Sequence, residues 1–284
     1  MNKTLYLVSI LPLLIYIAIL MLIVEHSWVI TMLSIGLAYG SLSYLISIRK
    51  LYYLAEASPH IALFIFTLSI IITGFYGLES FLLSITIGIF TITLLGLTTG
   101  KTRDLDKSLS LLIGLSSSFN VLALYSLLKT NPRGLSFTTI FIGDPLLTTT
   151  REAYVSLAIA LFTLTTITVT LREQLIISID RDFAKISSIK TWLYDSLAYA
   201  TLAINTIGLL RITGFILQHV LALLPSVAIS MIKKSLWESY LLTIVSTTYI
   251  ALASLNVSIL LGVPPSGIIG LAYIVYFIII YLKR

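Results

Sequence analysis

The chain has 284 residues, of which 58% are hydrophobic and 11% are charged, and its formal net charge is +6. A soluble domain carries about 25% charged residues and about 45–50% apolar ones, so this composition excludes a soluble globular protein and indicates a membrane protein. The sequence contains no cysteine, which excludes disulfides, thiolate metal sites and cysteine nucleophiles.

Apolar runs long enough to cross a bilayer recur along the chain, each close to the roughly 20 helical residues that a span requires. They lie near residues 5–24, 28–48, 58–80, 81–99, 108–128, 153–171, 193–210, 212–232, 237–260 and 266–282. The sequence therefore predicts an all-α, polytopic transmembrane helical bundle of about 8–10 spans, with residues 1–284 forming one transmembrane domain. The first run follows a basic start and lacks a small-residue cleavage site, so we expect a retained helix rather than a signal peptide.

The distribution of basic residues predicts the orientation in the membrane. If the N-terminus lies inside and ten spans alternate, fourteen of the 18 Lys and Arg residues fall on the inner side. These are Lys3, Arg49, Lys50, Lys101, Arg103, Lys107, Arg172, Arg181, Lys185, Lys190, Lys233, Lys234, Lys283 and Arg284, and the other four are Lys129, Arg133, Arg151 and Arg211. This positive-inside bias predicts a multi-pass plasma-membrane protein with both termini cytoplasmic. It also assigns the basic excess to topology rather than to nucleic-acid binding.

Two connecting segments are longer than a simple connection requires. Residues 129–152 fall on the outer side and are partly apolar, so we expect an extracellular interfacial or re-entrant piece packed on protein. Residues 172–192 fall on the inner side and mix charged with apolar residues. Within them Ile179, Phe183 and Ile186 recur at helical spacing, which predicts a short amphipathic helix. Its simplest interpretation is a helix lying on the bilayer surface.

Glu56 and His60 are the strongest candidate metal ligands in the chain. They are four residues apart, so a helix places both side chains on one face. A carboxylate and an imidazole together suit a divalent transition-metal ion such as Zn²⁺, Mn²⁺ or Fe²⁺. The alternative is a capped helix start, with Glu56 near the first turn and His60 at the membrane interface.

Gln218 and His219 lie near the middle of a predicted span, where exposure to lipid costs a few kcal/mol. We therefore expect them to face protein or water, with Asp195 and Asn205 of the preceding span as pairing partners. A structural polar cluster between helices and a ligand or relay on a transport path explain His219 equally well.

Four stretches of the chain resemble the membrane subunit of metal-ion ABC importers, the zinc, manganese and iron permease family. They are "GSLSYLISIRKLYYLAEASPH", "SIDRDFAKISSIK", "GFILQHVLALLP" and "VPPSGIIGLAY", in this order from about residue 40 to the C-terminus. The positions that match the family pattern are Glu56, His60, Asp180, Ala184, Gly214, Pro225, Pro265, Ser266 and Gly267.

The resemblance implies a transport subunit that is not itself an enzyme and binds no covalent cofactor. Its cargo would be Zn²⁺ or Mn²⁺, with Fe²⁺ as a third candidate, and Glu56 and His60 would line the path. The family commonly has apolar and small residues where this chain has Gln218 and His219. This departure indicates either that His219 is an additional metal ligand or that the selectivity is altered. The implied partners are a cytoplasmic ABC ATPase that drives alternating access, an extracellular metal-binding protein, a second copy of the permease, and membrane lipid.

The resemblance also implies that the cytoplasmic segment 172–192 couples the permease to its ATPase. The coupling residues would be Asp180, Arg181, Asp182, Phe183, Ala184 and Ser188. The family has a glycine where this chain has Ser188, so this chain is expected to differ in the local turn but not in the docking of the ATPase. Two alternatives stay open: an ABC importer permease for a metal chelate, with a wide apolar path, and a non-transport protein such as a membrane scaffold subunit or an intramembrane enzyme.

Overall fold

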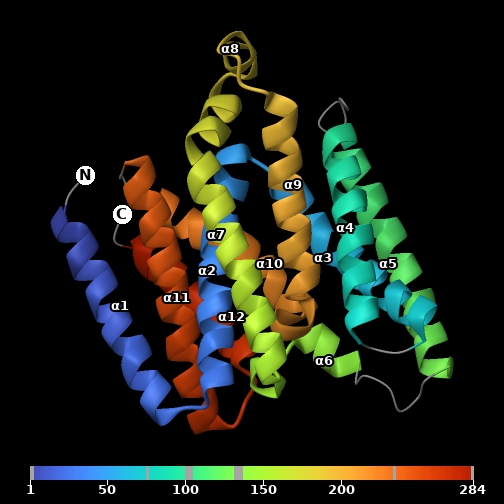
Figure 1. Ribbon diagram of the computed structural model, residues 1–284, viewed down its shortest axis with the longest axis horizontal. Helices are drawn as coiled ribbons and strands as arrows, with labels where there is room; N and C mark the ends of the chain where they lie inside the picture. The colour runs from blue at the N-terminus through green and yellow to red at the C-terminus, as the bar shows by residue number, and fades with distance from the viewer. Residues whose placement is uncertain (1–2, 75–76, 100–104, 131–136, 233–234, 283–284) are drawn as a thin grey trace.

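The computed structural model describes residues 3–74, 77–99, 105–130, 137–232 and 235–282, and every element in these ranges is helical (Figure 1). The elements are α1 (Lys3–Ile23), α2 (His26–Arg49), α3 (Tyr52–Thr73), α4 (Leu78–Thr99), α5 (Leu105–Thr130), α6 (Phe137–Ile142), the 3₁₀ helix η1 (Pro145–Leu147), α7 (Thr150–Ile179), α8 (Arg181–Ile186), α9 (Thr191–Gly208), α10 (Leu210–Ser230), α11 (Leu236–Leu261) and α12 (Pro265–Leu282). Of the basic residues that predict the topology, Lys101, Arg103, Arg133, Lys233, Lys234, Lys283 and Arg284 lie outside the described residues.

The prediction of an all-α bundle of 8–10 spans is confirmed. Within the described ranges each of the ten predicted apolar runs overlaps a long helix, and eight of these helices are long and apolar enough to cross a membrane. The run 58–80 is shifted relative to its helix, since α3 starts at Tyr52 and ends at Thr73. The other two are α1 and α9, and α9 is made less apolar by Asp195 and Asn205. The helix ends follow local chemistry: α11, for example, starts at a capping box on Ser235 and stops at Gly262, whose φ is +66°.

Helix α2 is the most deeply buried of the eight candidate spans and packs against α7, α10 and α11. Gly36 and Gly40 allow the backbone of α11 to approach it. A Cβ atom at Gly36 would lie 2.4 Å from the Cα atom of Thr248, and one at Gly40 would lie 2.7 Å from the Cα atom of Ile244. Small residues four apart are the usual means of packing membrane helices closely.

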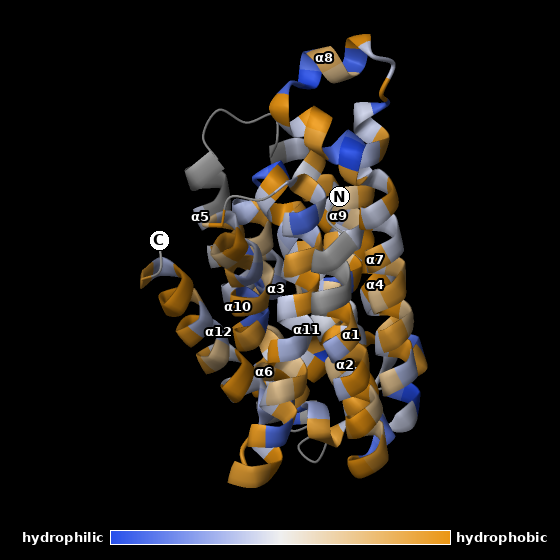
Figure 2. Ribbon diagram, turned by 90° about the vertical axis from the view of Figure 1, so that its left-hand side faces the viewer, coloured by the Kyte–Doolittle hydropathy of each residue, from blue (hydrophilic) through white to orange (hydrophobic). Residues whose placement is uncertain are grey.

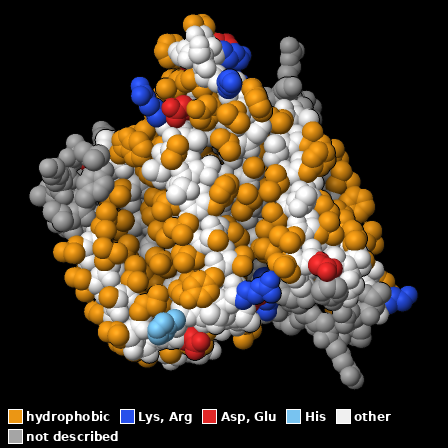
Figure 3. Space-filling model, viewed as in Figure 1, with side chains coloured by type: hydrophobic (Ala, Val, Ile, Leu, Met, Phe, Trp, Pro, Cys, Tyr) orange, Lys and Arg blue, Asp and Glu red, His pale blue; other side chains and the backbone are white. Residues whose placement is uncertain are grey.

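The surface of the bundle matches a protein embedded in lipid. Figure 2 shows hydrophobic residues along the length of the helices, and Figure 3 shows the charged side chains gathered at the two ends of the face in view. One end carries α8, and both termini of the chain lie on that side (Figure 1). Basic residues lie at the helix ends on this same side: Arg49 and Lys50 at the end of α2, and Lys190 at the start of α9. Which end faces the cytoplasm stays a prediction.

The segment 129–152 contributes α6 and η1, which cover the end of the bundle opposite α8 (Figure 1). Ile140 and Pro145 are buried, and α6 packs against α10. The contact is backbone to backbone, because a Cβ atom at Gly143 would lie 2.2 Å from the nitrogen of Gly214. Gly214 has φ 74° and ψ 159°, so α10 is interrupted there. Only glycine adopts this conformation readily.

The segment 172–192 differs from the predicted single amphipathic helix. Helix α7 continues to Ile179, and α8 comprises only the six residues Arg181–Ile186. The physical reason is that residues 172–178 contain no helix breaker, whereas Asp180 adopts an extended conformation that ends α7 and caps α8. Ile179 therefore belongs to a different helix from Phe183 and Ile186.

Candidate functional site

The structure brings His60 of α3 and His219 of α10 together. Their ring centroids are 5.5 Å apart in an edge-to-face arrangement. Phe215 contacts both rings, with centroid distances of 4.8 Å to His60 and 4.9 Å to His219. Since Phe215 follows Gly214, the interruption of α10 sets where both Phe215 and His219 lie.

The hydrogen bonds of the two imidazoles leave one nitrogen of each ring available. Nδ1 of His219 lies 3.0 Å from the carbonyl oxygen of Phe215. A carbonyl only accepts, so Nδ1 donates in this contact and Nε2 is the ring nitrogen left for another partner. Nδ1 of His60 lies 2.9 Å from Oγ of Ser117 on α5. The described residues offer no hydrogen bond to Nε2 of either ring.

Asn120 fixes the backbone of α3 at the same place. Its Nδ2 donates to the carbonyl oxygen of His60 over 2.9 Å, and its side chain is buried between α5 and α3. The "SSSFN" stretch of α5 therefore supplies two polar contacts to His60, from Ser117 and Asn120.

Glu56 lies one turn before His60 on α3, and its side chain is exposed. Across the described ranges no three His, Asp or Glu side chains gather closely enough to hold a metal ion. The predicted set of Glu56, His60 and His219 is therefore brought together only as the histidine pair. A zinc ion in a protein usually takes four ligands, so one copy of this chain offers an incomplete coordination sphere.

Gln218 has a structural partner, and its predicted pairing with Asp195 or Asn205 is wrong. Its Nε2 donates to the carbonyl oxygen of Thr206 over 2.7 Å, which ties α10 to α9. Asn205 instead donates to Oγ1 of Thr163 on α7 over 2.6 Å. Asp195 lies eleven residues before Thr206, about 16 Å along α9, and cannot reach Gln218.

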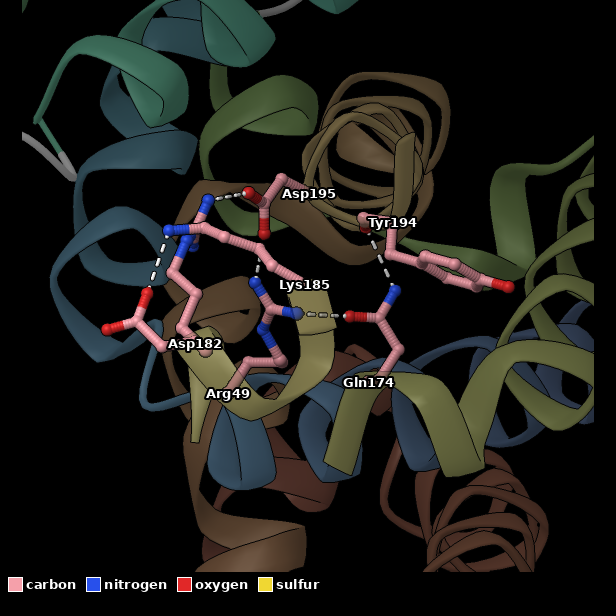
Figure 4. Close-up of polar contacts among 7 residues, drawn as sticks. Arg49, Gln174, Asp182, Lys185, Tyr194 and Asp195 are labelled. Atoms are coloured by element: carbon pink, nitrogen blue, oxygen red, sulfur yellow. Dashed lines mark hydrogen bonds and ion pairs between the residues drawn. The ribbon is translucent and has the colours of Figure 1, made fainter. Parts of the chain in front are cut away.

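Asp195 forms the centre of a second polar site, at the end of the bundle that carries α8 (Figure 4). One carboxylate oxygen pairs with Arg49 at the end of α2, and the other pairs with Arg181 at the start of α8. Gln174 of α7 accepts a hydrogen bond of 2.9 Å from Arg49 and donates one of 2.9 Å to the carbonyl oxygen of Tyr194. We call the group Arg49, Asp195 and Arg181 the Asp195 bridge.

Helix α8 is a short, capped element that presents apolar side chains to the outside. Oδ1 of Asp180 accepts hydrogen bonds of 2.9 Å from the backbone nitrogens of Asp182 and Phe183. A hydrogen bond from Lys185, together with its positive charge, lowers the pKa of Asp182. Ala184 is buried, whereas Phe183 is 56% exposed.

Ser188 adopts a left-handed conformation with φ 61° in the turn after α8. The turn therefore forms with serine in place of the glycine found in the resembling family. A residue with a Cβ atom is strained there by about 1–2 kcal/mol.

Comparison with known proteins gives a family and a fold. A family model described as the ABC 3 transport family matches residues 12–284. Among solved structures the chain is similar to PsaBC from Streptococcus pneumoniae in complex with Fab, with a TM-score of 0.77, 18% sequence identity and 94% coverage of each chain. At this identity the likeness concerns the fold. No curated protein matches the sequence.

Proposed function

The chain belongs to the ABC 3 transport family, and from this premise we propose that its cargo is zinc or manganese, with iron as a third candidate. The protein is the transmembrane subunit of a metal-ion ABC importer. Glu56, His60 and His219 would bind the ion transiently as it crosses the membrane.

The pairing of His60 with His219 is the observation that carries this proposal. Histidines that bind metals almost always donate their other ring N–H to a carbonyl or carboxylate, which fixes the tautomer. His219 makes this contact with the carbonyl oxygen of Phe215, so its Nε2 is prepared for a cation. Nδ1 of His60 is likewise engaged, by Ser117. Because Glu56 is exposed on the same face of α3, rotation of its side chain would add a carboxylate.

An incomplete set of ligands in one copy suits a transporter. Conduction requires a site that binds strongly enough for entry and weakly enough for release. We propose that a second copy of the permease encloses the path and supplies further ligands. Glu56 would then face the partner across the path.

The ATP-driven step would come from a separate cytoplasmic ATPase docked on α8, through the residues Asp180, Arg181, Asp182, Phe183, Ala184 and Ser188. Exposed Phe183 and Ile186 support this role, because a six-residue helix with apolar side chains outside the bundle suits a protein contact. Lys50 and Lys190 at the same end support a cytoplasmic location. An extracellular binding protein would deliver the ion at the opposite end, and ATP binding and hydrolysis would alternate the two open states.

Metal uptake tests the proposed path. Proteoliposomes would hold the permease with its ATPase and binding protein, and Zn²⁺ and Mn²⁺ uptake would be measured in parallel. His60→Ala and His219→Ala should each lower uptake at least about tenfold, the scale of effect seen when the surroundings of a metal ligand are disturbed. The matched control is His26→Ala. It removes the third histidine of the chain, which is exposed at the start of α2.

The remaining outcomes separate the alternatives. Loss in Glu56→Gln/His60→Ala with normal ATPase binding supports the metal path. Normal uptake in all of these variants would make the histidines structural and would favour a metal chelate as cargo. Failure of the permease to bind any ATPase would favour a scaffold role.

A further inference from the structure

The Asp195 bridge connects the short helix α8 to the core of the bundle through one buried carboxylate. The exposed fraction of the Asp195 side chain is 2%, so almost no water reaches it. Its two oxygens pair with different arginines, Arg49 from α2 and Arg181 from α8. A buried carboxylate needs one cationic partner, and this one has two.

The two arginines are held very differently. The Arg49 side chain is 5% exposed and is also bonded to Gln174, which is itself bonded to the backbone of Tyr194. The Arg181 side chain is 52% exposed. Among the described residues, it forms an ion pair with Asp195 alone. Arg49 is therefore fixed to α2, α7 and α9, whereas Arg181 is attached at a single point.

Arg181 also has space into which it can move. A cavity of about 460 Å³ lies beside the bridge, lined by Arg181, Lys185 and Asp195 together with Gly96, Leu97, Trp192 and Tyr199. If Arg181 leaves, Asp195 stays neutralised by Arg49. Separation of this one contact therefore avoids the large penalty of an unpaired buried carboxylate.

The other side of the bridge leads to the histidine pair. Arg49 ends α2, and α3 begins after only Lys50 and Leu51. Glu56 lies four residues after Tyr52, the first residue of α3, or about 6 Å along this helix. Arg49 thus joins Asp195 directly to the start of the helix that holds Glu56 and His60.

From this geometry we infer that the Arg181–Asp195 pair is a releasable contact that couples α8 to α3, with Arg49 as the permanent partner that keeps Asp195 in place. Arg181 and Asp195 are positioning residues and do not touch the ion. The inference rests on the proposed transport function, since it assigns α8 to the contact with the ATPase. It predicts that loss of Arg181 separates ATP hydrolysis from transport while the fold persists.

The test compares Arg181→Gln with Lys185→Gln in the complete complex. Lys185 is the matched control, because it is a cation on the same helix, similarly exposed at 56%, whose ion pair is with Asp182 of α8 itself. Two ratios would be measured: metal ions taken up per ATP hydrolysed, with Zn²⁺ and Mn²⁺ as probes, and the stimulation of ATP hydrolysis by the binding protein. Arg181→Gln should lower both at least about fivefold relative to Lys185→Gln, the lower limit of typical coupling between two sites. Arg181→Lys, which keeps the charge, should restore most of the loss.

Stability supplies the second readout. The midpoint of thermal unfolding should fall much less in Arg181→Gln than in Arg49→Gln, because only the second change removes the permanent partner of Asp195. Equal ratios in Arg181→Gln and Lys185→Gln, or an equal loss of stability in Arg181→Gln and Arg49→Gln, would overturn the inference. If the wild type takes up neither Zn²⁺ nor Mn²⁺, only the proposed cargo is contradicted. The stimulation of ATP hydrolysis by the binding protein still tests the Arg181–Asp195 contact in that case.

Discussion

Substitution of Gly214 by alanine tests the idea that a backbone contact shapes the histidine site. The added Cβ atom would lie 2.3 Å from the carbonyl carbon and oxygen of Ile142 and 2.4 Å from the nitrogen of Gly143. These are main-chain atoms, so no side-chain rotation relieves the contact. The conformation at φ 74° and ψ 159° costs a residue with a Cβ atom about 1–3 kcal/mol. Forcing an extra carbon into packed structure costs about another 1–3 kcal/mol.

The free energy of unfolding of the detergent-solubilised permease should therefore fall by about 2–6 kcal/mol in Gly214→Ala. Denaturant titration followed by tryptophan fluorescence measures it. Gly114→Ala is the matched control, since a Cβ atom at this helical position of α5 meets nothing within 4 Å. That change should be neutral or should stabilise by up to about 1 kcal/mol. Equal stability of the two variants would refute the reasoning.

Metal uptake extends the same test to function. Phe215 follows Gly214 directly and contacts both imidazole rings. A shift of the backbone at Gly214 should therefore disturb the pairing of His60 with His219 and lower uptake even at temperatures where the variant stays folded. Normal uptake in folded Gly214→Ala would show that the interruption of α10 does not set the site.

Three further predictions concern single positions. Ser188→Gly should raise stability by about 1 kcal/mol, measured as the midpoint of thermal unfolding, because glycine tolerates φ 61° without strain; no gain would contradict a strained turn. Asp180→Ala should destabilise α8 by about 1 kcal/mol and speed hydrogen exchange at the backbone amides of Asp182 and Phe183, which lose their acceptor. Unchanged exchange would show that the cap is dispensable. Gly36→Val should loosen α2 from α11 and lower the unfolding midpoint far more than the same change at Gly267, where a Cβ atom has open space; equal effects would contradict close helix packing.

The positions of the spans are predictable from the sequence because the physical cause is local. Apolar runs of the right length meet the requirement of the bilayer, and residues such as Gly262 or Asp180 end helices by their own backbone preferences. The same locality makes the shared face of Glu56 and His60 predictable, since residues four apart always meet on a helix.

The contacts between helices depend on tertiary packing that no local pattern contains. Ser117 and Phe215 complete the surroundings of His60 from two other helices, and their sequence context is ordinary for a membrane span. Asp195 did carry a signal, because an aspartate inside a predicted span demands a partner. The predicted pairing with Gln218 or His219 is wrong because Asp195 lies at the opposite end of α9 from Thr206, the residue that Gln218 contacts. Arg49 and Arg181 lie at the same end of the bundle as Asp195 and are the partners that the structure shows.

The separation of Arg49 and Asp195 in the sequence has a consequence for biogenesis. The two residues are 146 positions apart, so Arg49 leaves the ribosome on the order of ten seconds before its carboxylate partner is synthesised. During that interval Arg49 lacks its carboxylate partner, and an unpaired cation favours keeping the end of α2 on the cytoplasmic side, as the predicted orientation requires. Only after α9 has been synthesised can the same guanidinium pair with Asp195 and become buried. In the predicted orientation, one residue thus orients the nascent chain first and holds the finished bundle together afterwards.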